Sequence, residues 1–106
     1  MQFGLKKIEI EKINSVFASF PEVEEVVLYG SRAKGINKLS SDIDLTLKGK
    51  NLDYPLFCKI ALELDDLLLT YKIDLSLFRL INNADLIEHI NRRGVLFYRN
   101  EGTLLS

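Results

Sequence analysis

The chain has 106 residues, of which 47% are hydrophobic and 27% charged, so it can form one compact domain and is neither a disordered tail nor a low-complexity linker. Lysine and arginine total 14 against 15 aspartate and glutamate residues, a formal net charge of -1. This balance disfavours a protein that holds nucleic acid through bulk positive charge. We expect a single domain over residues 1–106 without a direct nucleic acid partner.

The single cysteine, Cys58, stands among apolar neighbours, which excludes an internal disulfide and a cysteine-rich zinc site. We expect Cys58 to be a small apolar filler of the core. No uncharged apolar run approaches the length of a membrane span, and no apolar segment follows the N-terminal lysines. The expected location is therefore the cytoplasm, with no membrane association.

The first third of the chain predicts a helix, a strand and a tight turn. Apolar residues recur at helical spacing over residues 5–20, and Pro21 ends this helix. Residues 26–29 are apolar and rich in valine, as in a buried strand. The segment 30–35 has a glycine at each end, which is typical of a strand-to-helix turn or a one-turn helix.

The middle of the chain predicts a second strand. After the polar loop 37–41, residues 42–47 alternate polar and apolar, as a strand with one buried face requires. We expect the core face of this strand to carry Ile43, Leu45 and Leu47.

The last half predicts a helix, a strand, a helix and a short strand. After a turn region, Pro55 opens a helical run with a broad apolar stripe to about residue 71, and residues 72–78 alternate again as a strand. A further helix, capped by Asn82 or Asn83 and ended by Gly94, leads into a strand at 95–98. The expected fold class is α/β (α+β), a small mixed sheet with helices packed on one face.

Three aspartates fall on the polar faces of the predicted strands. Asp42 and Asp44 are two residues apart, so their side chains leave the strand on the same side. Asp74 joins them if its strand is a neighbour in register. Three close carboxylates repel one another, and a hard divalent cation such as Mg2+ offsets that repulsion. The alternative for Asp42 and Asp44 alone is a solvated strand face.

The turn after the first strand is a candidate phosphate site. Gly30 allows close approach of the backbone and Ser31 adds a hydroxyl donor, at a point where free N–H groups can hold an anion. Arg32, Lys34 and Lys38 place positive charge nearby. The alternatives are a plain turn and ordinary solvated charges, the second applying most to Lys38. Metal-binding carboxylates beside a phosphate cradle indicate phosphoryl or nucleotidyl transfer.

These residues resemble the active-site signature of the polymerase-beta-type nucleotidyltransferase superfamily. The signature combines Gly30-Ser31, ten intervening residues, Asp42-Ile43-Asp44, and Asp74 in an apolar strand. Within the superfamily the chain is similar to minimal nucleotidyltransferase (MNT) domains, through the sequences GSRAKG, SDIDL, IDL and RGVLFY that begin at positions 30, 41, 73 and 93. Many relatives carry an arginine where this chain has Lys34, which keeps the charge and loses the planar fork.

The resemblance implies a polymerase-beta-like fold and Mg2+-dependent transfer of a nucleoside monophosphate, AMP from ATP, to a hydroxyl group. It implies that Gly30 and Ser31 hold the outer phosphates and that Asp42 and Asp44 bind the metal ions. Asp74 would bind one metal ion and help to activate the acceptor hydroxyl.

The resemblance also implies a protein partner. MNT domains are often paired with helical HEPN proteins in toxin–antitoxin systems, which implies an antitoxin that modifies a tyrosine of a HEPN toxin within a hetero-oligomer. Two other functions stay open from the sequence. One is a non-catalytic module that neutralises a partner by contact, and the other is a small-molecule (antibiotic) nucleotidyltransferase.

Overall fold

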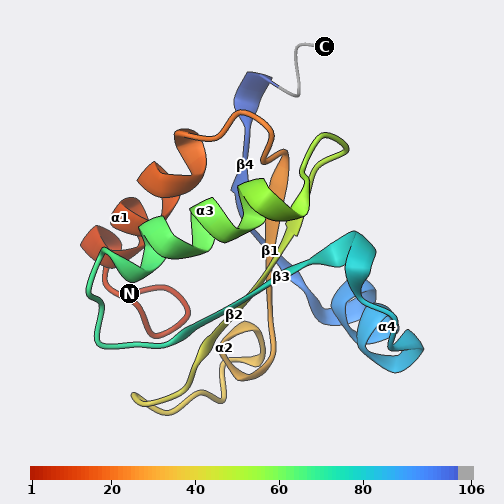
Figure 1. The fold of residues 1–106 in the computed structure, drawn as a ribbon. Helices are drawn as coiled ribbons and strands as arrows, with labels where there is room; N and C mark the ends of the chain where they lie inside the picture. The colour runs from red at the N-terminus through yellow and green to blue at the C-terminus, as the bar shows by residue number, and fades with distance from the viewer. Residues whose placement is uncertain (103–106) are drawn as a thin grey trace.

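A four-stranded mixed sheet is the centre of the computed structural model, which describes residues 1–102 (Figure 1). The strand order is β3-β2-β1-β4, with β1 antiparallel to β2 and β4, and β2 parallel to β3. The predicted mixed α/β fold is confirmed. In chain order the elements are α1 (Lys7–Ala18), β1 (Glu25–Tyr29), α2 (Ser31–Lys34), β2 (Ile43–Lys48), α3 (Tyr54–Asp65), β3 (Ile73–Leu77), the 3-10 turn η1 (Phe78–Leu80), α4 (Ala84–Arg93) and β4 (Val95–Arg99).

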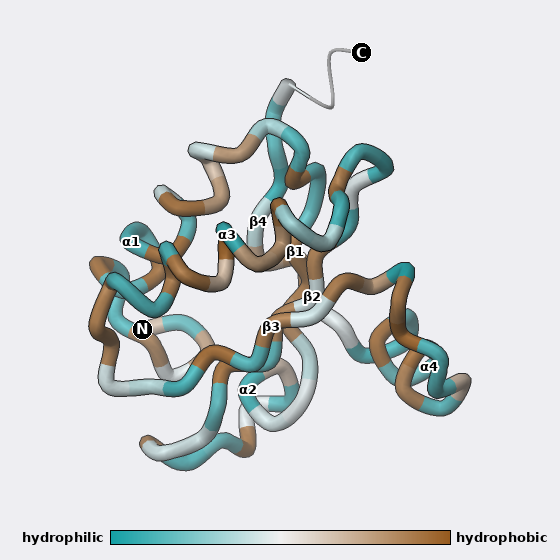
Figure 2. Tube along the Cα trace, viewed as in Figure 1, coloured by the Kyte–Doolittle hydropathy of each residue, from teal (hydrophilic) through white to brown (hydrophobic). Residues whose placement is uncertain are grey.

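The core lies between one face of the sheet and helices α1 and α3. The apolar residues of β2 that alternate with its aspartate are buried, and so are Val26 and Leu28 of β1. Ile13 and Phe17 of α1 pack into the same cluster, where α1 and α3 lie side by side over the strands (Figure 1). Hydrophobic residues accordingly gather along the strands beneath these two helices (Figure 2). The opposite face of β2 is left for polar residues.

Helix α3 is shorter than predicted, because it ends at Asp65 and not near residue 71. The chain leaves the helix through two tight backbone hydrogen bonds, from Leu67 N to Leu64 O and from Leu68 N to Asp65 O. Leu68 then adopts a positive φ of 54° and is exposed. The predicted end was wrong because leucines continue at helical spacing beyond Asp65, at residues 67–69, where the chain forms a turn.

The prediction that Cys58 fills the core is wrong, because its side chain is exposed. Ile60 and Leu64 are four residues apart on α3 and occupy the face that contacts the sheet. Cys58 is two residues before Ile60, which places it about 200° around the helix, on the solvent side.

Helix α4 stands apart from the α1 and α3 pair (Figure 1). The Asn83 side chain caps its N-terminus by accepting hydrogen bonds from the N–H groups of Asp85 and Leu86, as one of the two predicted caps. At its other end Gly94 packs so closely on Val27 of β1 that a Cβ atom there would collide with the valine side chain. Within residues 1–102, none of the helices combines the length and the apolar character of a membrane span.

The packing of α3 predicts opposite results for two leucines of the same helix. Leu64 is 3% exposed and Leu62 is 65% exposed. Leu64→Ala is expected to lower the free energy of unfolding by about 2–4 kcal/mol, since it leaves a cavity in the core. Leu62→Ala is the matched control and should change it by about 0.5 kcal/mol or less. Urea unfolding checks both values, and equal effects would contradict the assigned orientation of α3.

Candidate functional site

The strand register brings two of the predicted aspartates together. Parallel pairing of β2 with β3 places Asp44 directly opposite Asp74. Asp42 immediately precedes β2 and lies two residues before Asp44, so the side chains of the two residues project from the same side of the chain. Asp42 and Asp74 are exposed, whereas Asp44 is half-buried. The face opposite the core therefore carries a carboxylate cluster at one end of the two parallel strands.

The negative charges of Asp42 and Asp74 act on the Asp44 carboxyl. Burial raises the pKa of the Asp44 carboxyl above its ordinary value of 3.8, and the negative charges of Asp74 and Asp42 raise it further. The Arg32 guanidinium opposes these effects on the Asp44 pKa. The site thus carries an excess of negative charge that a cation would relieve.

Tyr29 is a residue of this site that the sequence analysis did not identify. It is the last residue of β1 and lies directly opposite Asp44 in the antiparallel pairing. Burial raises the pKa of the Tyr29 hydroxyl above 10.0, a side-chain hydrogen bond with Ser76 opposes the shift, and the charges of Asp74 and Asp44 add to it. The sequence did contain a signal for this position. Side chains alternate between the two faces of a strand, so burial of Val26 and Leu28 in the core places Tyr29 on the opposite face, with the aspartates.

The turn that follows β1 places Gly30 in close contact with Asp44 of the carboxylate cluster. Gly30 has φ 79° and ψ -154°, a conformation essentially restricted to glycine. A Cβ atom on Gly30 would also collide with Oδ2 of Asp44. Ser31 begins the four-residue helix α2, whose first N–H groups have no partner within the helix. The predicted phosphate turn and the aspartates are therefore neighbours in space.

Arg32 places its positive charge near the turn from a buried position, so the alternative of an ordinary solvated charge is wrong for this residue. Its side chain is 1% exposed and donates hydrogen bonds to the carbonyl oxygens of Phe3 (2.8 Å), Ser41 (2.8 Å from Nη2) and Leu39 (3.4 Å). The Tyr71 ring lies 4.8 Å from its guanidinium carbon. Arg32 thus connects the loop before Asp42 to the N-terminal turn at residues 2–5. These hydrogen bonds also satisfy the donors of a charge that is buried.

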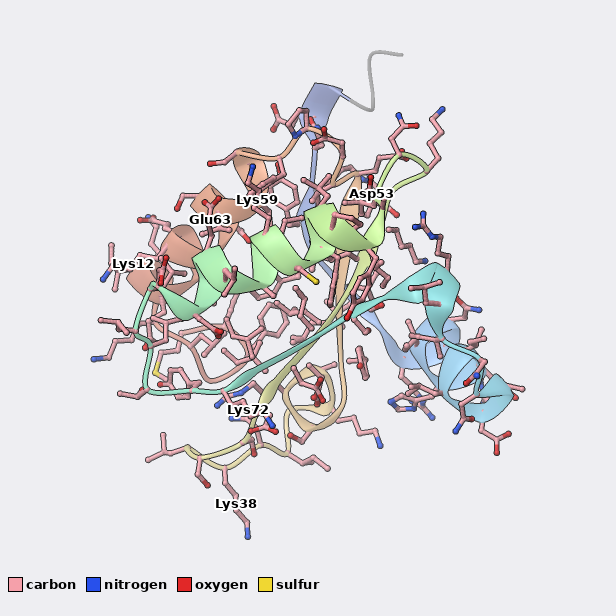
Figure 3. All side chains as sticks on the ribbon, viewed as in Figure 1. Lys12, Lys38, Asp53, Lys59, Glu63 and Lys72 are labelled. Carbon is pink, nitrogen blue, oxygen red and sulfur yellow. The ribbon has the colours of Figure 1, made fainter. Side chains whose placement is uncertain are left out.

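The other two basic residues near the turn are exposed. Lys34 ends α2, and Lys38 extends from the loop before β2 away from the rest of the molecule (Figure 3). The interpretation of Lys38 as a solvated charge agrees with this position. Lys34 remains within the helix that starts at the candidate phosphate turn.

The donor set fits a hard divalent cation. It consists of carboxylate oxygens alone, and their mutual repulsion is what a cation of this kind relieves. Residues 1–102 contain no group of three or more histidine, cysteine, aspartate or glutamate side chains close enough to enclose a metal by themselves. A cation held by one or two of these carboxylates would take its remaining ligands from water or phosphate oxygens.

Comparison with known proteins agrees with this geometry. The family model described as polymerase beta, nucleotidyltransferase matches residues 11–102. None of the curated proteins matches the sequence. A crystal structure of a toxin–antitoxin with AMP-PNP is similar at a TM-score of 0.67 and 22% identity, covering 93% of this chain and 77% of that chain.

A second similar structure is a tri-AMPylated Shewanella oneidensis HEPN toxin in complex with an MNT antitoxin. Its TM-score is 0.65 at 19% identity, and the match covers 93% of this chain and 76% of that chain. An MntA-HepT toxin–antitoxin structure gives a TM-score of 0.64 at 19% identity, with 92% and 76% of the two chains covered. At these identities the likeness establishes a shared fold.

The Gly30 conformation predicts different costs for two glycines of the same turn. Gly30→Ala is expected to lower the free energy of unfolding by about 2–4 kcal/mol, because the backbone becomes strained and Asp44 is displaced. Gly35 also has a positive φ of 75°, but a Cβ atom there would meet no atom within 4 Å. Gly35→Ala should therefore cost only about 1 kcal/mol. Urea unfolding measures both, and equal costs would contradict the contact with Asp44.

The raised pKa of Asp44 predicts that Asp44→Asn stabilises the metal-free protein. The pKa of the Asp44 carboxyl is higher in the folded protein than its ordinary value of 3.8, so folding favours the protonated form. The wild type therefore loses stability as the pH rises from 3.8 through the raised pKa of the folded state. At pH 7 in EDTA the variant should melt on the order of 2 °C higher than the wild type. The gain should shrink as pH falls through the raised pKa of Asp44, because the wild-type carboxyl then becomes protonated. Thermal melts between acid pH and pH 7 test this, and a lower melting temperature of the variant at pH 7 would contradict the unfavourable charge at Asp44.

Proposed function

This chain belongs to the polymerase beta nucleotidyltransferase family, and on that premise we propose that it transfers a nucleoside monophosphate, AMP from ATP, to a hydroxyl acceptor with the help of Mg2+. The observation that carries the proposal is the carboxylate cluster. Asp44 and Asp74 are direct neighbours across two strands, with Asp42 at the entry to the first strand and the Gly30 turn against Asp44.

Each part of the site has a role in this reaction. Gly30 lets the backbone of the turn lie directly against Asp44, and Ser31 offers its hydroxyl and N–H to the outer phosphates of the nucleotide. Asp42 and Asp44 would hold Mg2+, with Asp74 binding one metal ion as well. When bound, Mg2+ neutralises charge on the phosphates and stabilises the leaving pyrophosphate.

The transfer itself exchanges one bond for another. The acceptor oxygen forms a bond to the α-phosphorus while the bond from that phosphorus to the bridging oxygen breaks, and pyrophosphate departs. Asp74, exposed at the edge of the cluster, takes up the proton of the acceptor hydroxyl. Asp42 and Asp44 keep fixed positions because β2 is anchored through its buried face.

The proposed acceptor is a tyrosine of a HEPN-type toxin, and the chain would then act as the antitoxin in a hetero-oligomer. Two similar structures support this choice, since one is a toxin–antitoxin with AMP-PNP and the other contains an AMPylated HEPN toxin with an MNT antitoxin. The exposure of Asp42 and Asp74 supports it further, because a macromolecular acceptor needs an open site.

Label transfer tests this proposal. The chain is incubated with Mg2+, ATP labelled at the α-phosphate and lysate of its native cells, and compared with Asp42→Asn/Asp44→Asn. We expect label on a discrete protein band, reduced by about 100-fold or more in the variant, because charge stabilisation at the reacting phosphate is lost.

The matched control is Glu11→Gln/Glu63→Gln, which neutralises two exposed carboxylates on α1 and α3. It should transfer label like the wild type. Label on a small molecule in place of a protein would favour antibiotic-type transfer. Absence of any label that depends on Asp42 and Asp44 would contradict the proposal and favour a module that neutralises its partner by contact.

A further inference from the structure

A second candidate site lies where the parallel strands β2 and β3 end. It is a cavity of about 300 Å³ whose lining residues include the apolar Leu47, Leu77 and Phe78 and the basic Lys48, Lys50 and Arg79. We call it the basic pocket. The Lys48 ammonium lies 4.5 Å from the centre of the Phe78 ring, which fixes one charge over the apolar floor.

The cations of the basic pocket form no ion pair with the neighbouring carboxylates in the described part of the chain. Glu25 lies opposite Lys48 in the sheet, but its Oε2 accepts a hydrogen bond from Nη2 of Arg99 at 2.9 Å and forms an ion pair with it. Glu24 accepts the backbone N–H of Lys50 at 3.0 Å, and Asp53 caps α3 by accepting the N–H of Leu56. The ion pairs formed within residues 1–102 include none of the three pocket cations. The pocket therefore presents an apolar surface under excess positive charge.

Lys48 of the basic pocket is on the same side of β2 as the carboxylate cluster, whereas Leu47 and Leu77 of its lining belong to the core face. Asp44 and Lys48 are four residues apart, so their side chains point to the same face at a separation of about 13 Å along the strand. Between them lies a polar layer of Tyr29, Ser76 and Thr46, in which the Ser76 hydroxyl donates a hydrogen bond to Thr46 Oγ1 at 2.9 Å. A ligand that reaches both ends would cross this layer, with a negative group at the pocket and its reacting hydroxyl at the aspartates.

We propose that the basic pocket docks the acceptor, which is a polypeptide segment with an acidic side chain beside an apolar or aromatic one. This inference rests on the proposed function and specifies the substrate of the same site. A separation of about 13 Å corresponds to about four residues of extended chain. The docking residues of the acceptor therefore stand about four positions from the hydroxyl that receives the nucleotide.

The label-transfer assay tests this with charge reversal at the pocket. Lys48→Glu/Arg79→Glu is compared with Lys12→Glu/Lys59→Glu, a control of equal net charge on the exposed faces of α1 and α3 (Figure 3). We expect at least tenfold less transfer to the protein acceptor in the pocket variant and unchanged transfer in the control. Affinity for ATP with Mg2+ should be the same in both, because neither pair of residues lies at the phosphate turn.

The milder Lys48→Gln/Arg79→Gln variant replaces the charge-reversed one if reversal beside Glu25 disturbs folding, and it should show the same loss in part. Wild-type transfer with equal activity in the pocket and control variants would overturn the docking inference and leave the proposed function intact. A wild type that transfers no label would overturn both. Pocket-dependent label on RNA or on a small molecule would overturn the polypeptide as the occupant.

Discussion

The parallel pairing of β2 with β3 is the constraint on which the candidate site depends. Asp44 faces Asp74 only in the observed register, in which Ile43 and Leu45 also pair with their apolar counterparts on β3. A slip of one residue would turn the aspartates toward the core and the apolar residues toward solvent. Burial of the core therefore selects the register that assembles the charged cluster, and the repulsion within the cluster is offset by the stability of the core.

A second constraint fixes where the chain enters β2. Arg32 is buried and binds the carbonyl oxygens of Phe3 and Ser41, so it joins the N-terminal turn, α2 and the residue before Asp42. The same guanidinium lowers the pKa of Asp44, against the stronger effects of burial and its carboxylate neighbours. Arg32 is thus a structural support whose charge still acts on the site.

Strict alternation made much of this arrangement predictable from the sequence. It predicted β2 and β3 and the common face of Asp42, Asp44 and Asp74, because a period-two pattern distinguishes the buried face of a strand from the exposed one. It could not reveal that Arg32 points inward, since that depends on carbonyl oxygens of distant segments. Nor could it find the basic pocket, whose lining comes from the ends of two strands and the turn η1.

We propose that the β2–β3 register creates a cation site against the Gly30 turn. Paramagnetic line broadening by Mn2+, in the presence of a non-hydrolysable ATP analogue, tests it residue by residue. We expect selective loss of the amide signals of residues 30–31, 42–44 and 73–75, with the signals of α1 and α3 unaffected. Broadening confined to the acidic residues of α3, or none at all in the strands, would contradict it.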